Sequence, residues 1–153
     1  MDVDGVLTDG GFIWGPNGEE YKSFSFFDIM GLSLGRKAGL IFALISGEDS
    51  PLIDRMAVKM GISDVYKGCK DKASALRSFA AKYRLDMSEI CFMGDDVNDL
   101  PAMKLAGLAA SPATAHKAAL SEAGLVMKCG GGQGAVRELI DLILSNKNKE
   151  VSS

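Results

Sequence analysis

Short apolar runs alternate with helical patterns along almost the whole chain. The runs are continuous and do not alternate with polar residues, which is typical of strands buried on both faces of a parallel sheet. The expected strands are residues 1–3, 40–45, 65–66, 90–93, 108–110 and 125–128. The crossover connection in a strand–helix–strand unit is right-handed. This alternation therefore predicts the α/β class, with a doubly wound, Rossmann-like parallel sheet.

The segments between these strands carry signals for helix starts. Ser50 followed by Pro51 places a capping hydroxyl before a proline at the first helical position. Further starts are expected at Asp28 for a helix towards residue 37, at Asp71 for residues 72–83, and at Asn98 or Asp99. The last helix is expected over residues 133–144.

One segment, about residues 11–27, breaks the alternation and is expected to protrude as a β-hairpin. Pro16, Asn17 and Gly18 provide strong turn chemistry. Six of the eleven aromatic side chains fall here: Phe12, Trp14, Tyr21, Phe24, Phe26 and Phe27. An isolated hairpin is marginally stable in water, so this one must pack on the parent domain or on another subunit. Exposed apolar patches usually mark interfaces, and we expect a homotetramer.

Length and composition limit the classes of function. The 153 residues suit a single domain over residues 1–153, with a frayed tail from about residue 146 to residue 153. The net charge of −3 argues against nucleic acid as a partner, and no apolar run is long enough for a membrane span. Three scattered cysteines and the single His116 make no zinc site and suit the cytoplasm. Because the first motif begins at the very start, we also expect native residues before Met1.

Four polar motifs follow expected strands or open expected helices. They are Asp2-Val3-Asp4-Gly5, Ser46-Gly47, Lys72, and Gly94-Asp95-Asp96 with Asn98 and Asp99 beyond it. In an open α/β sheet, ligands bind at the carboxyl ends of the strands, where these motifs would converge. Each motif alone is more often a turn, a helix cap or a solvated charge, and it is their joint occurrence that points to a site.

The residue types suit phosphoryl transfer. Carboxylates brought this close repel one another unless a cation lies among them, and Mg²⁺ prefers such hard oxygen ligands. We expect Asp2, Asp95 and the main chain of Asp4 to bind Mg²⁺, with Asp2 as the nucleophile. Asp4 can protonate the leaving oxygen and later deprotonate the attacking water. Ser46 and Lys72 can donate to phosphate oxygens.

These motifs resemble those of the haloacid dehalogenase superfamily of aspartate-nucleophile phosphatases. The resemblance covers almost the entire chain, and the second aspartate of the first motif, Asp4, matches the phosphatase branch. Because Ser46 and Lys72 are only 26 positions apart, no cap domain fits between them. The resemblance therefore implies the haloacid dehalogenase fold without a cap.

Among capless members, the first motif, the aromatic hairpin and residues 131–138 are similar to phosphatases of 3-deoxy-octulosonate 8-phosphate (KDO 8-phosphate). Close relatives act on 2-keto-3-deoxynononate 9-phosphate (KDN 9-phosphate). Degenerate relatives fused to sialic acid-activating cytidylyltransferases are inactive, so an oligomerisation module is a further alternative. The resemblance implies a phosphorylated sugar acid as the small-molecule partner and a homotetramer in which a neighbouring subunit completes each active site.

One departure bears on the substrate. KDO-type members usually carry Arg directly after Gly47, where this chain has Glu48, and KDN-type members carry Glu there with a Lys at the position of Lys59. We therefore favour KDN 9-phosphate, with KDO 8-phosphate of lipopolysaccharide biosynthesis as the alternative. Glu48 would receive sugar hydroxyls, and Lys59 or Arg55 would meet the substrate carboxylate, although a solvated helix face explains both cations equally well.

Several further residues are expected close to the metal ligands or to the substrate. We expect Asp9, Asp96, Asn98 and Asp99 around the metal ligands. Asp28 matches a family position near the substrate, although a role as a helix cap would also explain it. Arg137 could reach a neighbouring active site or lie on the surface of the last helix.

Overall fold

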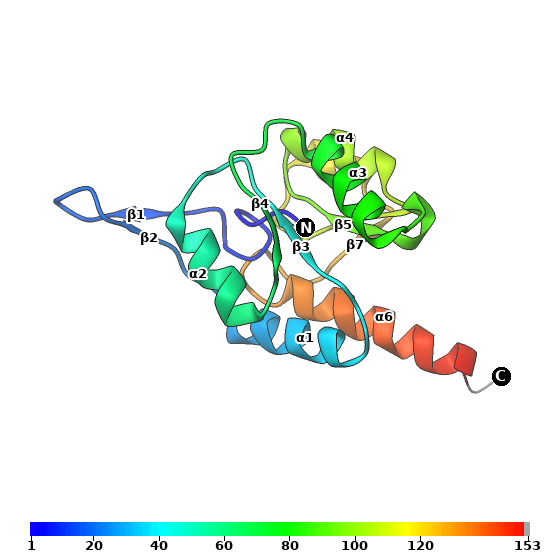
Figure 1. The fold of residues 1–153 in the computed structure, drawn as a ribbon. Coiled ribbons are helices and arrows are strands. Elements are labelled where there is room, and N and C mark those ends of the chain that lie inside the picture. The colour runs from blue at the N-terminus through cyan, green and yellow to red at the C-terminus, as the bar shows by residue number, and fades with distance from the viewer. Residues whose placement is uncertain (152–153) are drawn as a thin grey trace.

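The computed structural model describes residues 1–151, with the side chains of residues 1–147. Its parallel strands form two groups (Figure 1). In the first, β3 (Ala43–Ile45) pairs with β4 (Asp64–Tyr66). In the second, β6 (Leu108–Ser111) lies between β5 (Cys91–Met93) and β7 (Leu125–Val126).

The first residues of the chain join the two groups. The Met1 amine donates to the Ala43 carbonyl at 3.0 Å, and Ile45 N donates to the Met1 carbonyl at 2.9 Å. On the other side, Asp2 N donates to the Met93 carbonyl at 3.0 Å. Residues 1–3 therefore occupy the expected strand position between β3 and β5, although they do not form a regular strand. Across the layer, the order is β4, β3, residues 1–3, β5, β6 and β7. If these six segments are numbered by their order in the chain, with residues 1–3 as the first, this is the doubly wound order 3-2-1-4-5-6.

Helices cover both faces of this layer (Figure 1). One face carries α1 (Phe26–Lys37), α2 (Pro51–Met60) and α6 (Ala135–Val151), packed over a shared apolar cluster. The other carries α3 (Lys72–Tyr83), α4 (Leu100–Leu105) and α5 (Lys117–Glu122) over a second cluster. Two short 3₁₀ turns, η1 (Met87–Glu89) and η2 (Val97–Asp99), flank β5. This confirms the predicted α/β fold.

Helix starts with a local capping signal were predicted correctly. Ser50 Oγ accepts from Leu52 N at the start of α2, and Asp71 Oδ1 accepts from Ser74 N at the start of α3. The start of α1 was wrong, because Ser25 accepts from Phe27 N and is the cap.

The helix start predicted at Asn98 or Asp99 is confirmed in position, because Asp99 is the N-cap residue of α4, although its side chain makes no capping bond there. Asp96 accepts from Val97 N at the start of the preceding turn, η2. The predicted end of the last helix was wrong, since α6 continues to Val151 and its regular backbone includes most of the expected frayed tail. Residues 152–153 of that tail lie outside the described residues.

The hairpin is shorter than expected but projects from the body (Figure 1). Its strands β1 (Ile13–Trp14) and β2 (Glu20–Tyr21) pair antiparallel around a turn closed by Gly18 N donating to the Gly15 carbonyl. Its apolar side chains face solvent, and Ile13 and Trp14 are each 70% exposed. None of the described helices combines the length and apolarity that a membrane span needs.

Candidate active site

The loop after residues 1–3 is folded tightly on itself. The Val3 carbonyl accepts from the amides of Val6, Leu7 and Thr8. Thr8 Oγ1 accepts from Gly5 N at 3.2 Å and from Gly10 N at 3.1 Å. These bonds fix the backbone around Asp2 and Asp4.

Gly5 permits the approach of the neighbouring loop. Its φ is +83°, a conformation that side chains rarely adopt, and a Cβ there would overlap the Asp95 carboxylate. Glycine at this position therefore brings Asp95, at the end of β5, against the first loop. The site forms where the order of strands reverses, as expected for a doubly wound sheet.

Lys72 lies buried beneath the first loop, at the start of α3. Its Nζ is 2.8 Å from Asp2 Oδ1 and 2.7 Å from Asp99 Oδ1. Burial alone would lower the pKa of Lys72, but the Asp2 and Asp99 carboxylates raise it above its ordinary value. Lys72 is therefore a fixed positive charge beside the proposed nucleophile.

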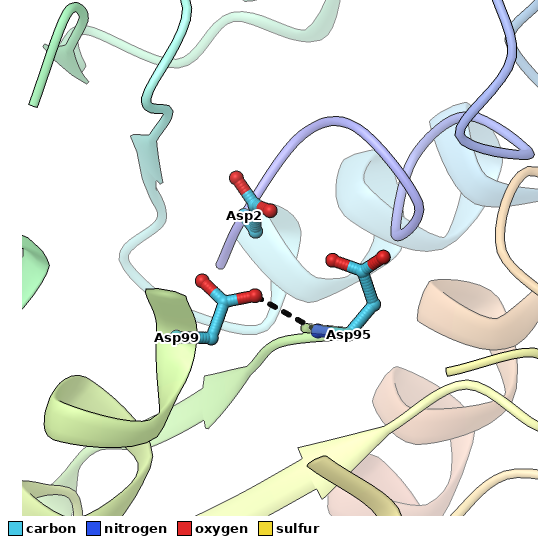
Figure 2. A group of neighbouring side chains, drawn as sticks. All are labelled: Asp2, Asp95 and Asp99. Atoms are coloured by element: carbon cyan, nitrogen blue, oxygen red, sulfur yellow. Dashed lines mark hydrogen bonds between the residues drawn. The ribbon is translucent and has the colours of Figure 1, made fainter. Parts of the chain in front are cut away.

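Three carboxylates meet at this point. Asp2, Asp95 and Asp99 each offer an oxygen within 4.8 Å of the others, and Figure 2 shows Asp2 of the first loop converging with Asp95 and Asp99, which both belong to the segment after β5. Asp99 Oδ2 accepts from Asp95 N at 2.9 Å and Oδ1 accepts from Lys72. Both oxygens of Asp99 therefore accept hydrogen bonds from the protein, which agrees with the expectation that Asp99 lies around the metal ligands.

The charges of this cluster are poorly balanced without a cation. Burial, followed by the Asp99 charge, raises the pKa of Asp2 to about 6 in spite of Lys72. Burial and the Asp2 and Asp99 charges raise the pKa of Asp95 to about 8. An oxygen-rich cluster whose carboxylates resist ionisation fits a divalent cation such as Mg²⁺, which would hold Asp2 and Asp95 in their charged forms.

A cavity of about 250 Å³ opens above these carboxylates. Its lining contains most of the residues predicted from the sequence: Asp2, Asp4, Ser46, Gly47, Glu48, Lys72, Asp95, Asp96 and Asn98, together with Gly10. Ser46 is buried at the end of β3, and its Oγ accepts from Glu48 N at 3.1 Å. A larger cavity of about 440 Å³, at the amino ends of the strands, has a mainly apolar lining and no comparable cluster of charges.

Five of the predicted site residues lie outside the cavity lining, namely Arg55, Lys59, Asp9, Asp28 and Asp99. Arg55 and Lys59 are exposed on α2, and Lys59 Nζ lies 5.3 Å from the centre of the Phe26 ring. Asp9 is exposed and accepts from Gly11 N, as a turn residue does.

Asp28 has a different task from the two expected. It is buried on α1, and its oxygens accept from Gly134 N at 3.2 Å and Arg137 N at 2.9 Å at the start of α6. Asp28 therefore caps a helix other than its own. The side chain of Arg137 pairs with Asp141, one turn further along α6.

Two structural contributors were missed by the sequence analysis. Lys22, just after β2, has its Nζ 2.8 Å from Asp4 Oδ1. Gly132 N donates to the Val6 carbonyl, and a Cβ on Gly131 would overlap the Gly5 carbonyl oxygen. Only the resemblance of residues 131–138 to family members marked the glycine loop, and no local pattern marked Lys22, because its contact spans 18 positions.

Comparison with known proteins agrees with this geometry. A family model for haloacid dehalogenase-like hydrolases matches residues 26–139. The 3-deoxy-D-manno-octulosonate 8-phosphate phosphatase of Escherichia coli K12 is 35% identical over 149 residues, which are 97% of this chain and 79% of that protein.

Solved structures of such enzymes have the same fold. The enzyme of Moraxella catarrhalis, in complex with magnesium, phosphate and KDO, superposes with a TM-score of 0.92 at 37% identity over 95% of this chain and 83% of that one. The cobalt-bound enzyme of Haemophilus influenzae gives a TM-score of 0.92 at 34% identity, over 97% and 86%. The chain therefore belongs to the haloacid dehalogenase-like hydrolases, as a capless phosphoric monoester hydrolase with a divalent metal cofactor.

Proposed function

We propose that this protein hydrolyses KDO 8-phosphate, with Mg²⁺ as its cofactor and Asp2 as its nucleophile. The relatives that bear this activity in their names are matched over nearly the whole chain. This replaces KDN 9-phosphate, favoured from the sequence, as the first choice of substrate. The observation that carries the proposal is the gathering of Asp2, Asp4, Ser46, Lys72 and Asp95 around one cavity.

In the first half of the proposed reaction, an Asp2 oxygen attacks phosphorus and the bond to the sugar oxygen breaks. Asp4 gives its proton to that leaving oxygen, and an aspartyl-phosphate remains. In the second half, Asp4 takes a proton from water, which attacks phosphorus and releases inorganic phosphate and free Asp2. Lys72 and Ser46 donate to the phosphoryl oxygens throughout.

The metal would be held by Asp2, Asp95 and the main chain of Asp4. When bound, Mg²⁺ would neutralise charge on the phosphoryl group and on the carboxylates around it. Asp99 holds the amides of Asp95 and Asp96, and so keeps their loop in place.

A second candidate substrate is KDN 9-phosphate, and Glu48 is the observation that favours it. Glu48 lines the cavity, and a carboxylate there accepts from sugar hydroxyls but repels a substrate carboxylate. Arg55 and Lys59 lie beyond the cavity, so we propose that they contact a carboxylate only in a substrate that extends past its rim.

Measurements of kcat/KM for the two sugar-acid phosphates test these alternatives. We expect a higher value for KDO 8-phosphate, and loss of phosphate release for both substrates when the metal is chelated. A clear preference for KDN 9-phosphate that Glu48→Gln reduces would overturn the choice of substrate and leave the phosphatase activity intact. No turnover of either substrate would contradict the proposed function.

We also propose a homotetramer in which a neighbouring subunit closes each active site, a cytoplasmic location, and a single domain over residues 1–153. The exposed aromatic hairpin supports the assembly. The three unpaired cysteines, Cys69, Cys91 and Cys129, support a reducing compartment.

A further inference from the structure

Lys22 is a buried charge on an otherwise exposed hairpin. Its side chain is only 4% exposed, whereas Tyr21 before it is 56% exposed. Its Nζ lies 2.8 Å from Asp4 Oδ1 and 3.6 Å from Glu20 Oε1. Removing an ammonium group from water is costly unless it is closely paired, so the contact with Asp4 is what holds Lys22 in this place.

The two oxygens of Asp4 have different surroundings. Oδ1 accepts from Lys22 and, at 3.5 Å, from Thr8 Oγ1. Oδ2 is buried and has no hydrogen-bond partner among the described residues. Asp4 lines the active-site cavity and its side chain is 27% exposed, so Lys22 anchors through Oδ1 a carboxylate that borders the cavity.

We propose that Lys22 is a positioning residue for acid–base chemistry, which holds the Asp4 carboxylate by Oδ1 beside the oxygens that exchange protons during the reaction. The proposal rests on the role proposed above for Asp4. In the first half-reaction the proton moves from the Asp4 carboxyl group to the leaving sugar oxygen as its bond to phosphorus breaks. In the second, the Asp4 carboxylate accepts a proton from the attacking water, and Lys22 neither gains nor loses a proton.

If Lys22 positions Asp4, the loss of activity on removing Lys22 should depend on the leaving group of the substrate. An alkoxide leaves slowly unless it is protonated, whereas p-nitrophenolate leaves without a proton. The value of kcat/KM covers steps up to departure of the leaving group, so it isolates the acid function of Asp4. Loss of Lys22 should therefore impair hydrolysis of an alkyl phosphate far more than hydrolysis of an aryl phosphate.

The experiment compares Lys22→Met and Lys22→Arg with Asp4→Asn and with Lys37→Met, which removes an exposed lysine on α1. The substrates are KDO 8-phosphate and p-nitrophenyl phosphate, both with saturating Mg²⁺. General acid–base catalysis contributes typically 10²–10⁴-fold, and we expect Lys22→Met to lose roughly 10- to 100-fold in kcat/KM on the alkyl ester. We expect little loss on the aryl ester, substantial recovery in Lys22→Arg, and no effect of Lys37→Met.

Equal losses on both esters would overturn the proposal, because they would indicate that Lys22 binds the phosphate or supports the fold. Circular dichroism checks the fold, and Lys22→Gln, which keeps a donor of similar reach, replaces the methionine variant if that one is unfolded. If Asp4→Asn loses activity on the alkyl ester while Lys22→Met has the kcat/KM of the wild type, the inference about Lys22 fails and the proposed function stands. If Asp4→Asn keeps full activity on the alkyl ester, the role of Asp4 fails, and the proposal for Lys22 with it.

Discussion

At the scale of single residues, Lys72 offsets part of the negative charge of the site. It is paired with Asp2 and Asp99 in a buried setting, where each charge would be costly alone. The pair with Asp99 extends to the amides of Asp95 and Asp96, so one lysine connects the nucleophile to the loop after β5. Asp2 and Asp95 nevertheless keep raised pKa values, which leaves a place for a cation.

These pKa values predict how stability depends on pH in the metal-free protein. Unfolded aspartates lose their protons near pH 3.8, whereas folded Asp2 and Asp95 keep theirs until about pH 6 and pH 8. The folded state binds more protons in this window, so the free energy of unfolding falls as pH rises through it. Mg²⁺ takes the place of these protons, and its stabilising effect should grow with pH.

Thermal melts at pH 6 and pH 8, in chelator and in Mg²⁺, measure both effects. We expect a lower Tm at pH 8 in chelator and a larger rise on adding Mg²⁺ at that pH. Asp95→Asn, which has a similar shape and no charge, should show a weaker pH dependence and little response to Mg²⁺. A response to Mg²⁺ of the same size in this variant would contradict the assignment of Asp95 as a ligand.

At the scale of elements, Asp28 links α1 to α6. It was expected at the start of its own helix or near the substrate, but it accepts from amides that the start of α6 leaves unpaired. Asp28→Ala should lower the free energy of unfolding by about 1–3 kcal/mol, because buried donors lose their acceptor. Urea denaturation measures this loss, and Asp28→Asn, which keeps one oxygen, should lose less. A large rise in KM without loss of stability would instead support contact with the substrate.

The contrast between Asp71 and Asp28 shows which features a sequence reveals. Asp71 caps the helix that follows it directly and accepts from the Ser74 amide three residues along, so the pattern is local and was predictable. The bonds of Asp28 reach across 106 and 109 positions, and the pair of Lys22 with Asp4 crosses the hairpin. Such contacts depend on how elements pack, which periodicity does not encode. The motif residues were predictable because parallel strands bring their carboxyl ends to one edge.

At the scale of the whole molecule, the hairpin exposes apolar side chains that the fold of a single chain does not cover. The body buries its apolar side chains in two clusters on either side of the sheet, whereas the hairpin and the start of α1 expose theirs. The rings of Phe12 and Trp14 lie with their centres 5.1 Å apart on this surface, tilted by 49°, and Phe26 and Phe27 are each more than 70% exposed. Exposed apolar surface of this extent is typical of an interface between subunits.

We therefore predict that the protein is a tetramer in solution and that the hairpin holds it together. Light scattering at micromolar concentration should give four times the chain mass of 16.2 kDa. Trp14→Glu should shift the mass towards smaller species, because a buried carboxylate without a partner disfavours association. Ile41→Glu is the matched control, since Ile41 is also exposed but precedes β3 at the opposite edge of the sheet. A stable, active monomer of the unmodified protein would contradict the prediction.

The central claim is that Asp2 becomes phosphorylated during turnover, and rapid quenching with KDO 8-phosphate and Mg²⁺ tests it most directly. Acid quenching within the first turnover, followed by mass spectrometry of the peptides, locates the phosphoryl group. We expect it on Asp2, with none in Asp2→Asn, and more of it in Asp4→Asn when p-nitrophenyl phosphate is the donor. Turnover without a phosphorylated peptide, or a phosphoryl group on Asp95 in place of Asp2, would contradict the account.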